Sequence, residues 1–572
     1  MLHRCRVARV WKWSFLVAVV ALSACAWQTS RRSSGWEGFV KEFLDSYFTA
    51  RPDVAVDRGR HESDGKLPDW SRNGIDRQIA TLRAYRRRAI AFPEGALQQR
   101  QKLERDHLVT VIDGELFWLT SVAGPGNPAY YQSSIDPNVY AVREYALLPH
   151  RLRAYTVYAR ALAAAAEQIR ANMRLPMPRT WVDLGHVIFG GMAEYLEKDV
   201  PGIFAPVGDP ALQAEFRAAN GDAIQAMRSL DLWFQAQRGA ATEDFAMGAE
   251  QFEAMLYATE RVDLSLEQLE GIGRQDLERN LTMLRETCSQ YLPGGTITEC
   301  VAKVRARKSP EGPVDAARRQ LGELKVFLQE QEVVTIPGAE EAVVAESPPY
   351  MRWASAYVMI PGPYEKGLSS TYYITPPDPQ WSAEDQEDHI LSDADLLFTS
   401  VHEVWPGHFL QIAHAKRAPS TLGQAFVSYA CGEGWAHYTE EMMWEAGLGR
   451  GDREKHIAQL RQALLRDVRF LSAIGMHTRG MKVMESERMF RESAFADPAT
   501  ARREAARGTF DPQYLNYTLG KLMIRKLRED WTATRGGRAA WREFHDRFLS
   551  FGGPPTPLVR NVMMQGKSGP PV

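Results

Sequence analysis

Hydrophobic residues recur every three or four positions along most of the chain, which is typical of amphipathic helices. The first such stripe comprises Trp36, Phe39, Val40, Phe43, Leu44, Tyr47 and Phe48. Further periodic segments, separated by Pro and Gly, lie near 74–92, 98–121, 150–172, 210–237, 264–290 and 314–331. No fixed repeat length is visible, so the pattern predicts a mainly α fold rather than a solenoid.

Strand-like composition is confined to a few short stretches, so we expect only a small β element. The stretches rich in β-branched and aromatic residues lie at 333–336, 343–344 and 369–374. Helical periodicity then returns near 385–447, 453–485, 512–534 and 537–550.

A Pro-rich region near 337–380 divides the chain. It predicts an N-terminal helical lobe, 36–340, and a C-terminal helical lobe, 341–572, which holds the candidate chemistry. No Gly/Ser-rich or Pro-rich linker is long enough to let two units move freely. We therefore expect two lobes that share a deep central cleft.

Residues 1–25 have the pattern of a lipoprotein signal peptide. Basic residues precede the apolar run 13–22, which is too short for a comfortable membrane span. The run ends in Leu-Ser-Ala-Cys25, which resembles the lipobox of bacterial lipoproteins, so Cys25 is the predicted lipidation site and 26–35 a linker. We expect an exported protein, held by this lipid at the periplasmic face of the outer membrane and touching the membrane only there. An uncleaved anchor helix or an ordinary cleaved signal would also export the chain.

Composition and charge place the protein among globular proteins without a nucleic-acid partner. Hydrophobic residues make up 45% and charged residues 24% of the chain. Its 69 Lys and Arg are balanced by 71 Asp and Glu, which gives a formal net charge of -2. Residues 1–25 hold four basic residues and no acid, so their removal changes this charge to -2 minus 4, or -6. No broad basic footprint for nucleic acid results.

Three cysteines lie beyond the signal peptide. Cys288 and Cys300 flank the turn-rich stretch 292–296, and in an oxidising compartment they could form a disulfide. Cys431 is expected to be a small buried packing residue.

The segment His402-Glu-Val-Trp-Pro-Gly-His408 resembles the H-E-x-x-H zinc motif with two residues inserted. Histidines four apart on a helix share one face, whereas a separation of six turns the second about 240° away from the first. Pro406 and Gly407 can resolve this, because Pro breaks the helical hydrogen bonding and Gly adopts unusual backbone angles. The sequence therefore predicts a broken helix that brings both imidazoles to one zinc ion.

Catalytic zinc takes three protein ligands, and Glu433 is the predicted third. It lies 25 residues after His408 in a segment that we expect to form a second helix. Glu440, two turns further on the same face, could hydrogen-bond a ligating imidazole. His437 is an alternative ligand. The structural alternative is that the histidines are ordinary helix-end residues and the acids form a solvated face.

These motifs resemble those of the bacterial proteins that contain domain of unknown function 885. The motifs of that family have the forms H-E-x-x-P-G-H and E-G-W-A-x-Y-x-E. The likeness spans nearly all of the mature chain. The site is more distantly similar to gluzincin peptidases of the thimet oligopeptidase and Taq carboxypeptidase types. The spacing of Glu433 and Glu440 matches the third ligand and the following acid of those enzymes. The resemblance implies a two-lobed helical peptidase fold.

The same resemblance implies further roles. Tyr517 would hydrogen-bond the tetrahedral intermediate, and His477 would face the site, although Ala473 stands where an Asp is expected before it. A strand before the zinc helix would pair with the substrate backbone. That strand corresponds to 369–374, with Ser370, Thr371, Tyr372 and Tyr373 as the substrate-binding residues.

The predicted function is zinc-dependent hydrolysis of short peptides, with one Zn²⁺ per chain. Zinc would polarise the scissile carbonyl, and Glu403 would take a proton from the attacking water and pass it to the leaving amine. Lys521 or Arg525 could recognise a free carboxylate. The same ligands also suit manganese or cobalt. Alternatives are hydrolysis of a non-peptide amide or ester, and a ligand-binding lipoprotein without catalysis.

Overall fold

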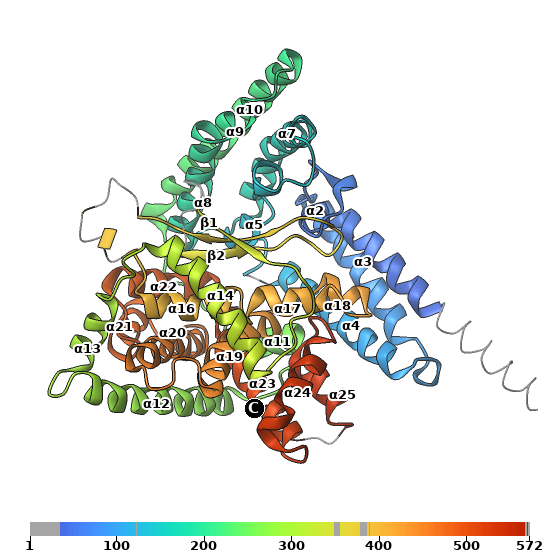
Figure 1. The fold of residues 1–572 in the computed structure, drawn as a ribbon. Helices are drawn as coiled ribbons and strands as arrows, with labels where there is room; N and C mark the ends of the chain where they lie inside the picture. Colours follow the sequence, from blue (N-terminus) through green and yellow to red (C-terminus); the bar gives the residue numbers. More distant parts are fainter. Residues whose placement is uncertain are drawn as a thin grey trace, which may run out of the picture.

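Figure 1 shows a computed structural model of the protein, which describes residues 35–121, 123–347, 355–377, 382, 386–387, 389–566, 569 and 572. The predicted signal peptide, with Cys25, and all of the linker except residue 35 lie outside these residues. Within the described part of the chain, no helix combines the length and the apolar character needed to cross a membrane.

The N-terminal helices form a small core of their own. The first described helix covers residues 35–50, and all seven residues of its predicted apolar stripe are at most 6% exposed. They pack with apolar residues of the helices that follow and with Leu422 and Ala425. These helices are α2 (Pro52–Asp57), α3 (Arg72–Ile90) and α4 (Gln99–Thr120).

Three long helices form the tip at the top of Figure 1. They are α7 (Leu148–Asn172), α8 (Arg179–Lys198) and α10 (Pro210–Ala236), and the shorter α5 (Ala129–Gln132), α6 (Asn138–Ala141) and α9 (Val200–Phe204) join them. Aromatic residues such as Tyr155, Phe189 and Phe234 fill a second core between them.

The third and largest core surrounds the candidate site and draws helices from both sides of the predicted boundary at 340/341. From the N-terminal side come α11 (Ala249–Glu260), α12 (Leu266–Tyr291), α13 (Ile297–Arg305) and α14 (Pro313–Gln331). From the C-terminal side come α16 (Asp393–Glu403), α17 (His408–Ala415), α19 (Tyr429–Ala446), α20 (Arg453–Thr478), α21 (Val483–Ser493), α22 (Pro498–Phe510), α23 (Asn516–Thr532), α24 (Trp541–Leu549) and α25 (Thr556–Met563). The short α18 (Thr421–Ala425) contacts α4 instead. Packing around the site therefore does not divide at residue 340.

A three-stranded sheet is the only named sheet in the described residues, and the fold is mainly α with this small β element, as predicted. Its order is β1 (Ala342–Glu346), β3 (Ser370–Ile374), β2 (Ala356–Met359). The central strand pairs in parallel with β1, Ala342 facing Ser370, and antiparallel with β2, Ala356 facing Ile374. The stretch 333–336 is not a strand, because Val333 and Val334 instead enter the helical core after α14.

Cys288 of α12 and Cys300 of α13, which are 12 positions apart in the sequence, form a disulfide. Cys431 is buried and not part of a disulfide. The bond fits a protein that folds in an oxidising compartment.

We expect that replacing Cys288 and Cys300 together by Ala will lower the free energy of unfolding by ~3 kcal/mol, because the bond restricts the unfolded chain. Urea denaturation with and without a thiol reductant measures this. Reductant should destabilise the wild type and leave the double variant unchanged, and equal stability of both oxidised proteins would contradict the expectation.

Candidate metal centre

The helix breaks between the two histidines of the motif. Helix α16 ends at Glu403 and α17 begins at His408, and the rings of His402 and His408 lie with their centroids 4.9 Å apart. A Cβ on Gly407 would lie 1.7 Å from the carbonyl oxygen of His402, so only glycine permits this close turn. The break at the Pro-Gly step thus brings together two imidazoles that a straight helix would hold apart.

Glu433 of α19 lies between these imidazoles. Its Oε2 is 3.4 Å from His402 Nε2 and 3.3 Å from His408 Nε2. One ligand atom from each of the three residues lies within 4.8 Å of the others, and no other group of His, Cys, Asp and Glu in the described residues has this spacing. Although burial raises it, the pKa of Glu433 lies well below its ordinary value because His408 and His402 face the carboxylate.

Glu440 binds the ring nitrogen of His402 that does not face Glu433. Its Oε1 lies 2.7 Å from His402 Nδ1 and 3.2 Å from Arg466 Nη2, and its Oε2 lies 3.3 Å from His437 Nδ1. Burial raises the pKa of Glu440, but Arg466 and His437 together hold it below its ordinary value. Since Nδ1 of His402 is occupied, its Nε2 is the nitrogen that faces Glu433. His437 is bound to Glu440 rather than directed at the three candidate ligands.

Glu403 lies beside the three candidate ligands at the end of α16. Its Oε2 accepts a hydrogen bond from the backbone N–H of Val358 at 3.1 Å, which joins it to strand β2. Burial raises the pKa of Glu403. A carboxylate that is easier to protonate than usual is better suited to accept a proton as a general base.

Tyr517, the second residue of α23, also lies beside the candidate ligands. Its ring is nearly parallel to that of His402, with the centroids 6.3 Å apart, and the ring of Tyr429 meets its edge at 5.9 Å. The guanidinium carbons of Arg469 and Arg507 lie 4.9 and 5.8 Å from the Tyr517 ring centre. Burial raises the pKa of Tyr517, so its hydroxyl is a donor at neutral pH.

The predicted substrate strand is in the wrong position for its role. Ser370, Thr371, Tyr372 and Tyr373 belong to β3, whose two edges are already paired with β1 and β2. Tyr372 is fully buried and its hydroxyl lies 3.3 Å from Ser400 Oγ, so it ties the sheet to α16. The strand beside Glu403 is the edge strand β2. Its four residues lie within the Pro-rich region and give only a weak strand signal in the sequence.

His477, predicted to face the site, makes the contacts of a core residue. Its Nε2 lies 2.7 Å from the carbonyl oxygen of Gly508, and its ring packs against Phe245 and Phe252. Burial lowers the pKa of His477 to about 4, so it is neutral at pH 7. Ala473, one turn earlier, is fully buried.

The two basic residues considered for carboxylate binding are engaged elsewhere. Lys521 is fully buried and pairs with Asp276, while Arg525 Nη1 lies 3.0 Å from Glu441 Oε1. Arg507, which contacts Tyr429 and Tyr517, was not predicted, because a single arginine in α22 carries no motif.

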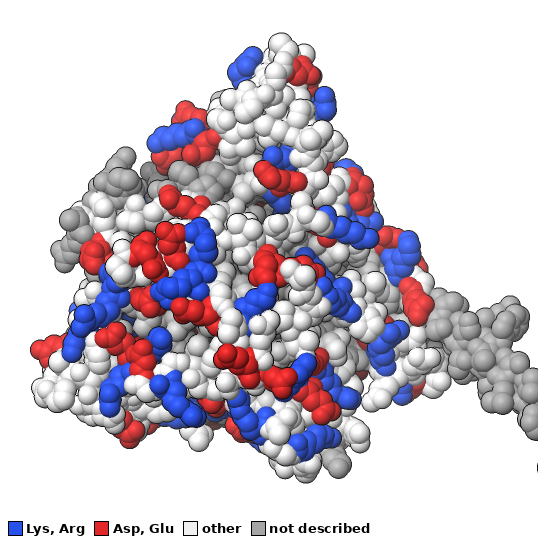
Figure 2. Space-filling model, viewed as in Figure 1, with Lys and Arg blue, Asp and Glu red and all other residues white. Residues whose placement is uncertain are grey.

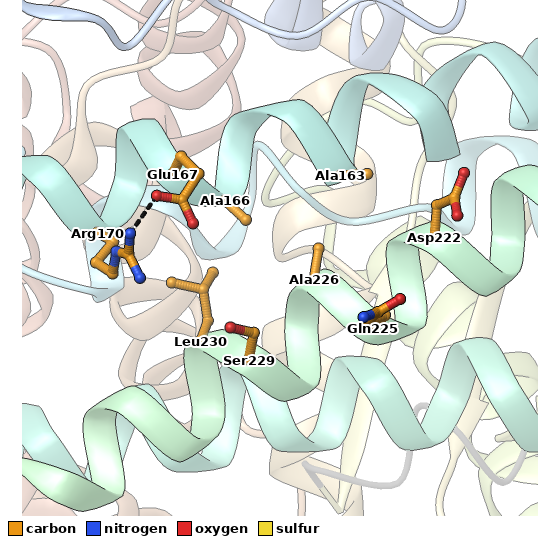
Figure 3. A pocket seen from close by; sticks show the side chains of 9 residues that line it. All are labelled: Ala163, Ala166, Glu167, Arg170, Asp222, Gln225, Ala226, Ser229 and Leu230. Atoms are coloured by element: carbon orange, nitrogen blue, oxygen red, sulfur yellow. Dashed lines mark hydrogen bonds and ion pairs between the residues drawn. The ribbon is translucent and has the colours of Figure 1, made fainter.

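Away from the centre, a groove runs between α7 and α10 in the tip of the molecule (Figure 3). Ala163, Ala166, Ala226 and Ser229 form part of its lining, with an ion pair between Arg170 and Glu167 at one end. None of the predicted site residues lines it, and the deep central cleft stays a prediction. On the face shown in Figure 2, basic and acidic side chains are interspersed.

Comparison with known proteins identifies a family and a fold. The family described as "Bacterial protein of unknown function (DUF885)" matches residues 52–563. The chain resembles the solved structure of a "putative lipoprotein of unknown function from Shewanella oneidensis", with 23% identity, a TM-score of 0.77, and coverage of 92% of this chain and 99% of the other. It also resembles the "putative lipoprotein from Colwellia psychrerythraea", with 17% identity, a TM-score of 0.74, and coverage of 94% and 99%. No curated protein sequence matches. At these identities the structural likeness concerns the fold.

We expect Gly407→Ala to lower the affinity for zinc by on the order of 100-fold or more, because the new methyl group must displace the backbone that places His408. Zinc content after dialysis against a competing chelator measures the loss. Gly432→Ala is the matched control, since a Cβ there meets only Val427 Cγ1, at 3.4 Å. Equal zinc retention in both variants would contradict the role of the break.

We expect Glu440→Gln to weaken zinc binding by ~10- to 100-fold while the protein stays folded, because His402 loses the carboxylate that orients it. Competitive titration with a zinc-sensitive dye measures the affinity. Glu445→Gln, on the same helix and paired with Arg528, is the control that should bind as the wild type does. An unchanged affinity in Glu440→Gln would show that His402 needs no such support.

Proposed function

We propose that this chain, which belongs to the DUF885 family of bacterial proteins of unknown function, is a lipid-anchored zinc hydrolase that cleaves short peptides in the cell envelope. The observation that carries the proposal is the grouping of His402, His408 and Glu433 within 4.8 Å, with Glu403 beside them. Export and lipid anchoring are supported by the signal pattern that ends at Cys25 and by the likeness to two structures described as those of a "putative lipoprotein".

The donor set fits zinc. Two imidazole nitrogens and one carboxylate are a common set of protein ligands in catalytic zinc sites, which keep a further position for water or substrate. Glu440 behind His402 matches the carboxylate that usually supports a ligating histidine. Bound at these residues, zinc would supply a Lewis acid for the carbonyl oxygen of the substrate.

The chain itself supplies the proton transfer. Only one carboxylate oxygen of Glu403 is used in the hydrogen bond from Val358, so the other is available to a water molecule. Glu403 would take a proton from that water as it attacks, and would return it to the leaving amine. Tyr517, whose hydroxyl stays protonated, would donate a hydrogen bond to the oxygen of the reacting carbonyl.

Strand β2 would position the peptide. The N–H of Val358 points away from β3 toward Glu403, and backbone groups alternate in direction along an antiparallel strand, so those of Ala356 point the same way. Among the described residues, no strand pairs with this edge. An extended peptide could add to it by backbone hydrogen bonds, which would bring a peptide bond to Glu403.

We expect Glu403→Gln to retain zinc and to lose hydrolysis of a mixed peptide library by at least ~100-fold, because the amide cannot accept the proton. Glu433→Ala should lose both zinc and activity. Zinc content by mass spectrometry and library hydrolysis are measured on the same samples. Glu529→Ala, whose side chain is 57% exposed on α23, is the control for both measurements.

Two results would contradict the proposal. Full zinc occupancy in Glu433→Ala would show that Glu433 is not a zinc ligand. Wild-type activity in Glu403→Gln would show that Glu403 is not the base, and the hydrolysis would then have another cause.

A further inference from the structure

Arg507 lies in the immediate surroundings of the candidate metal centre. Its Nη2 is 3.1 Å from the hydroxyl of Tyr429, and its guanidinium lies 5.8 Å from the ring centre of Tyr517. Tyr429 is one helical turn before Glu433 on α19, so the two side chains share a face. Arg507 is thus bound to the face of α19 that carries the third candidate ligand.

Arg507 differs from the other cations around Tyr517. Arg469 is buried and bound by both oxygens of Glu504, at 2.7 and 2.8 Å, and Arg466 is buried against Glu440. The side chain of Arg507, by contrast, is 29% exposed, similar to the 23% of Glu433 and the 21% of His408. All three side chains are therefore partly accessible to solvent, as contact with a substrate requires.

Its hydrogen bonds leave part of the guanidinium available. Nε donates to Oδ2 of Asp511 at 3.0 Å. Nη2 lies 2.8 Å from the same oxygen in an ion pair and donates a hydrogen bond to the hydroxyl of Tyr429. Nη1 takes no part in these bonds. Because Asp511 and Tyr429 hold the group from one side, the guanidinium is oriented before a ligand arrives, which lowers the entropy cost of binding.

The distance to the centre limits what Arg507 can recognise. The ring of Tyr517 is 6.3 Å from that of His402 and 5.8 Å from the guanidinium carbon, so Arg507 lies at most about 12 Å from the His402 ring. An extended chain covers about 3.3–3.6 Å per residue, so this distance corresponds to three residues or fewer.

We propose that Arg507 binds a carboxylate of the substrate, the C-terminal carboxylate of a short peptide, and that cleavage therefore occurs within one to three residues of that end. The proposal rests on the proposed function. Arginine suits this task because its planar array of N–H donors matches a carboxylate and stays charged at every physiological pH. An Asp or Glu side chain would offer the same chemistry, and the test separates the two sources.

The test compares two peptide libraries of identical random sequence, one of tetrapeptides with a free carboxylate and one of their C-terminal amides. Zinc-loaded wild type, Arg507→Gln, Arg507→Lys and Arg503→Gln are incubated with both, and relative kcat/KM values are read by quantitative mass spectrometry. Arg503 is exposed on the same helix and is the matched control. Zinc content and circular dichroism of each variant show that it is folded and loaded.

The wild type is expected to prefer the free acids by ~10- to 100-fold, as is usual for a hydrogen bond to a charged group. The preference should fall to near unity in Arg507→Gln, take an intermediate value in Arg507→Lys, and persist in Arg503→Gln. If amides with Asp or Glu at one fixed position are preferred instead, and this preference depends on Arg507, the carboxylate comes from a side chain.

Other outcomes overturn the inference. Equal rates on acids and amides, without preference for acidic residues, would remove the carboxylate site and leave the peptidase proposal standing. A preference that survives in Arg507→Gln would assign it to another residue. If zinc-loaded wild type cleaves neither library, the proposed function itself fails, and this inference fails with it.

Discussion

A buried carboxylate, that of Glu440, fixes the arrangement on which the candidate centre depends. An unpaired charge in a protein interior is strongly unfavourable, so it must be met by donors in good geometry. The donors come from three helices: His402 from α16, His437 from α19 itself and Arg466 from α20. These helices are held at one relative position, because a displacement of any of them would leave Glu440 uncompensated. Hence His402 binds Glu440 through Nδ1 and presents Nε2 to Glu433.

The helix that carries Tyr517 is fixed by a different constraint, the close contact of two backbones. A Cβ on Gly434 would lie 2.4 Å from Gly520 Cα, so α19 and α23 approach more closely than any side chain allows. Lys521, the residue after Gly520, is buried between Asp276 of α12 and Glu441 of α19. Buried ion pairs of this kind contribute little net stability, but they penalise every other alignment of the helices. They also include α12, which explains why packing does not divide at residue 340.

The sequence was sufficient for the parts of the site that depend on local geometry. The six-residue spacing of the histidines and the Pro406-Gly407 step predicted the helix break before His408, and the helical repeat predicted the common face of Glu433 and Glu440. Pairing between strands depends on contacts distant in sequence, so β3 could be identified as a strand, but not as the central one. His477 carried no local signal to separate a core histidine from a site residue. Arg507 could not be found at all, because its role depends on Tyr429, which lies 78 residues earlier.

The centre combines fully buried residues with partly exposed ones. Glu440, His437 and Lys521 are fully buried on α19 and α23, whereas Glu433, His408 and Arg507 are partly exposed. A substitution among the buried residues disturbs several ion pairs at once, and such networks are not additive. A substitution at Arg507 of α22 changes a partly exposed side chain and leaves those buried ion pairs intact. If Arg507 selects the substrate, specificity in this fold can therefore change through α22 without altering the residues that would hold the metal.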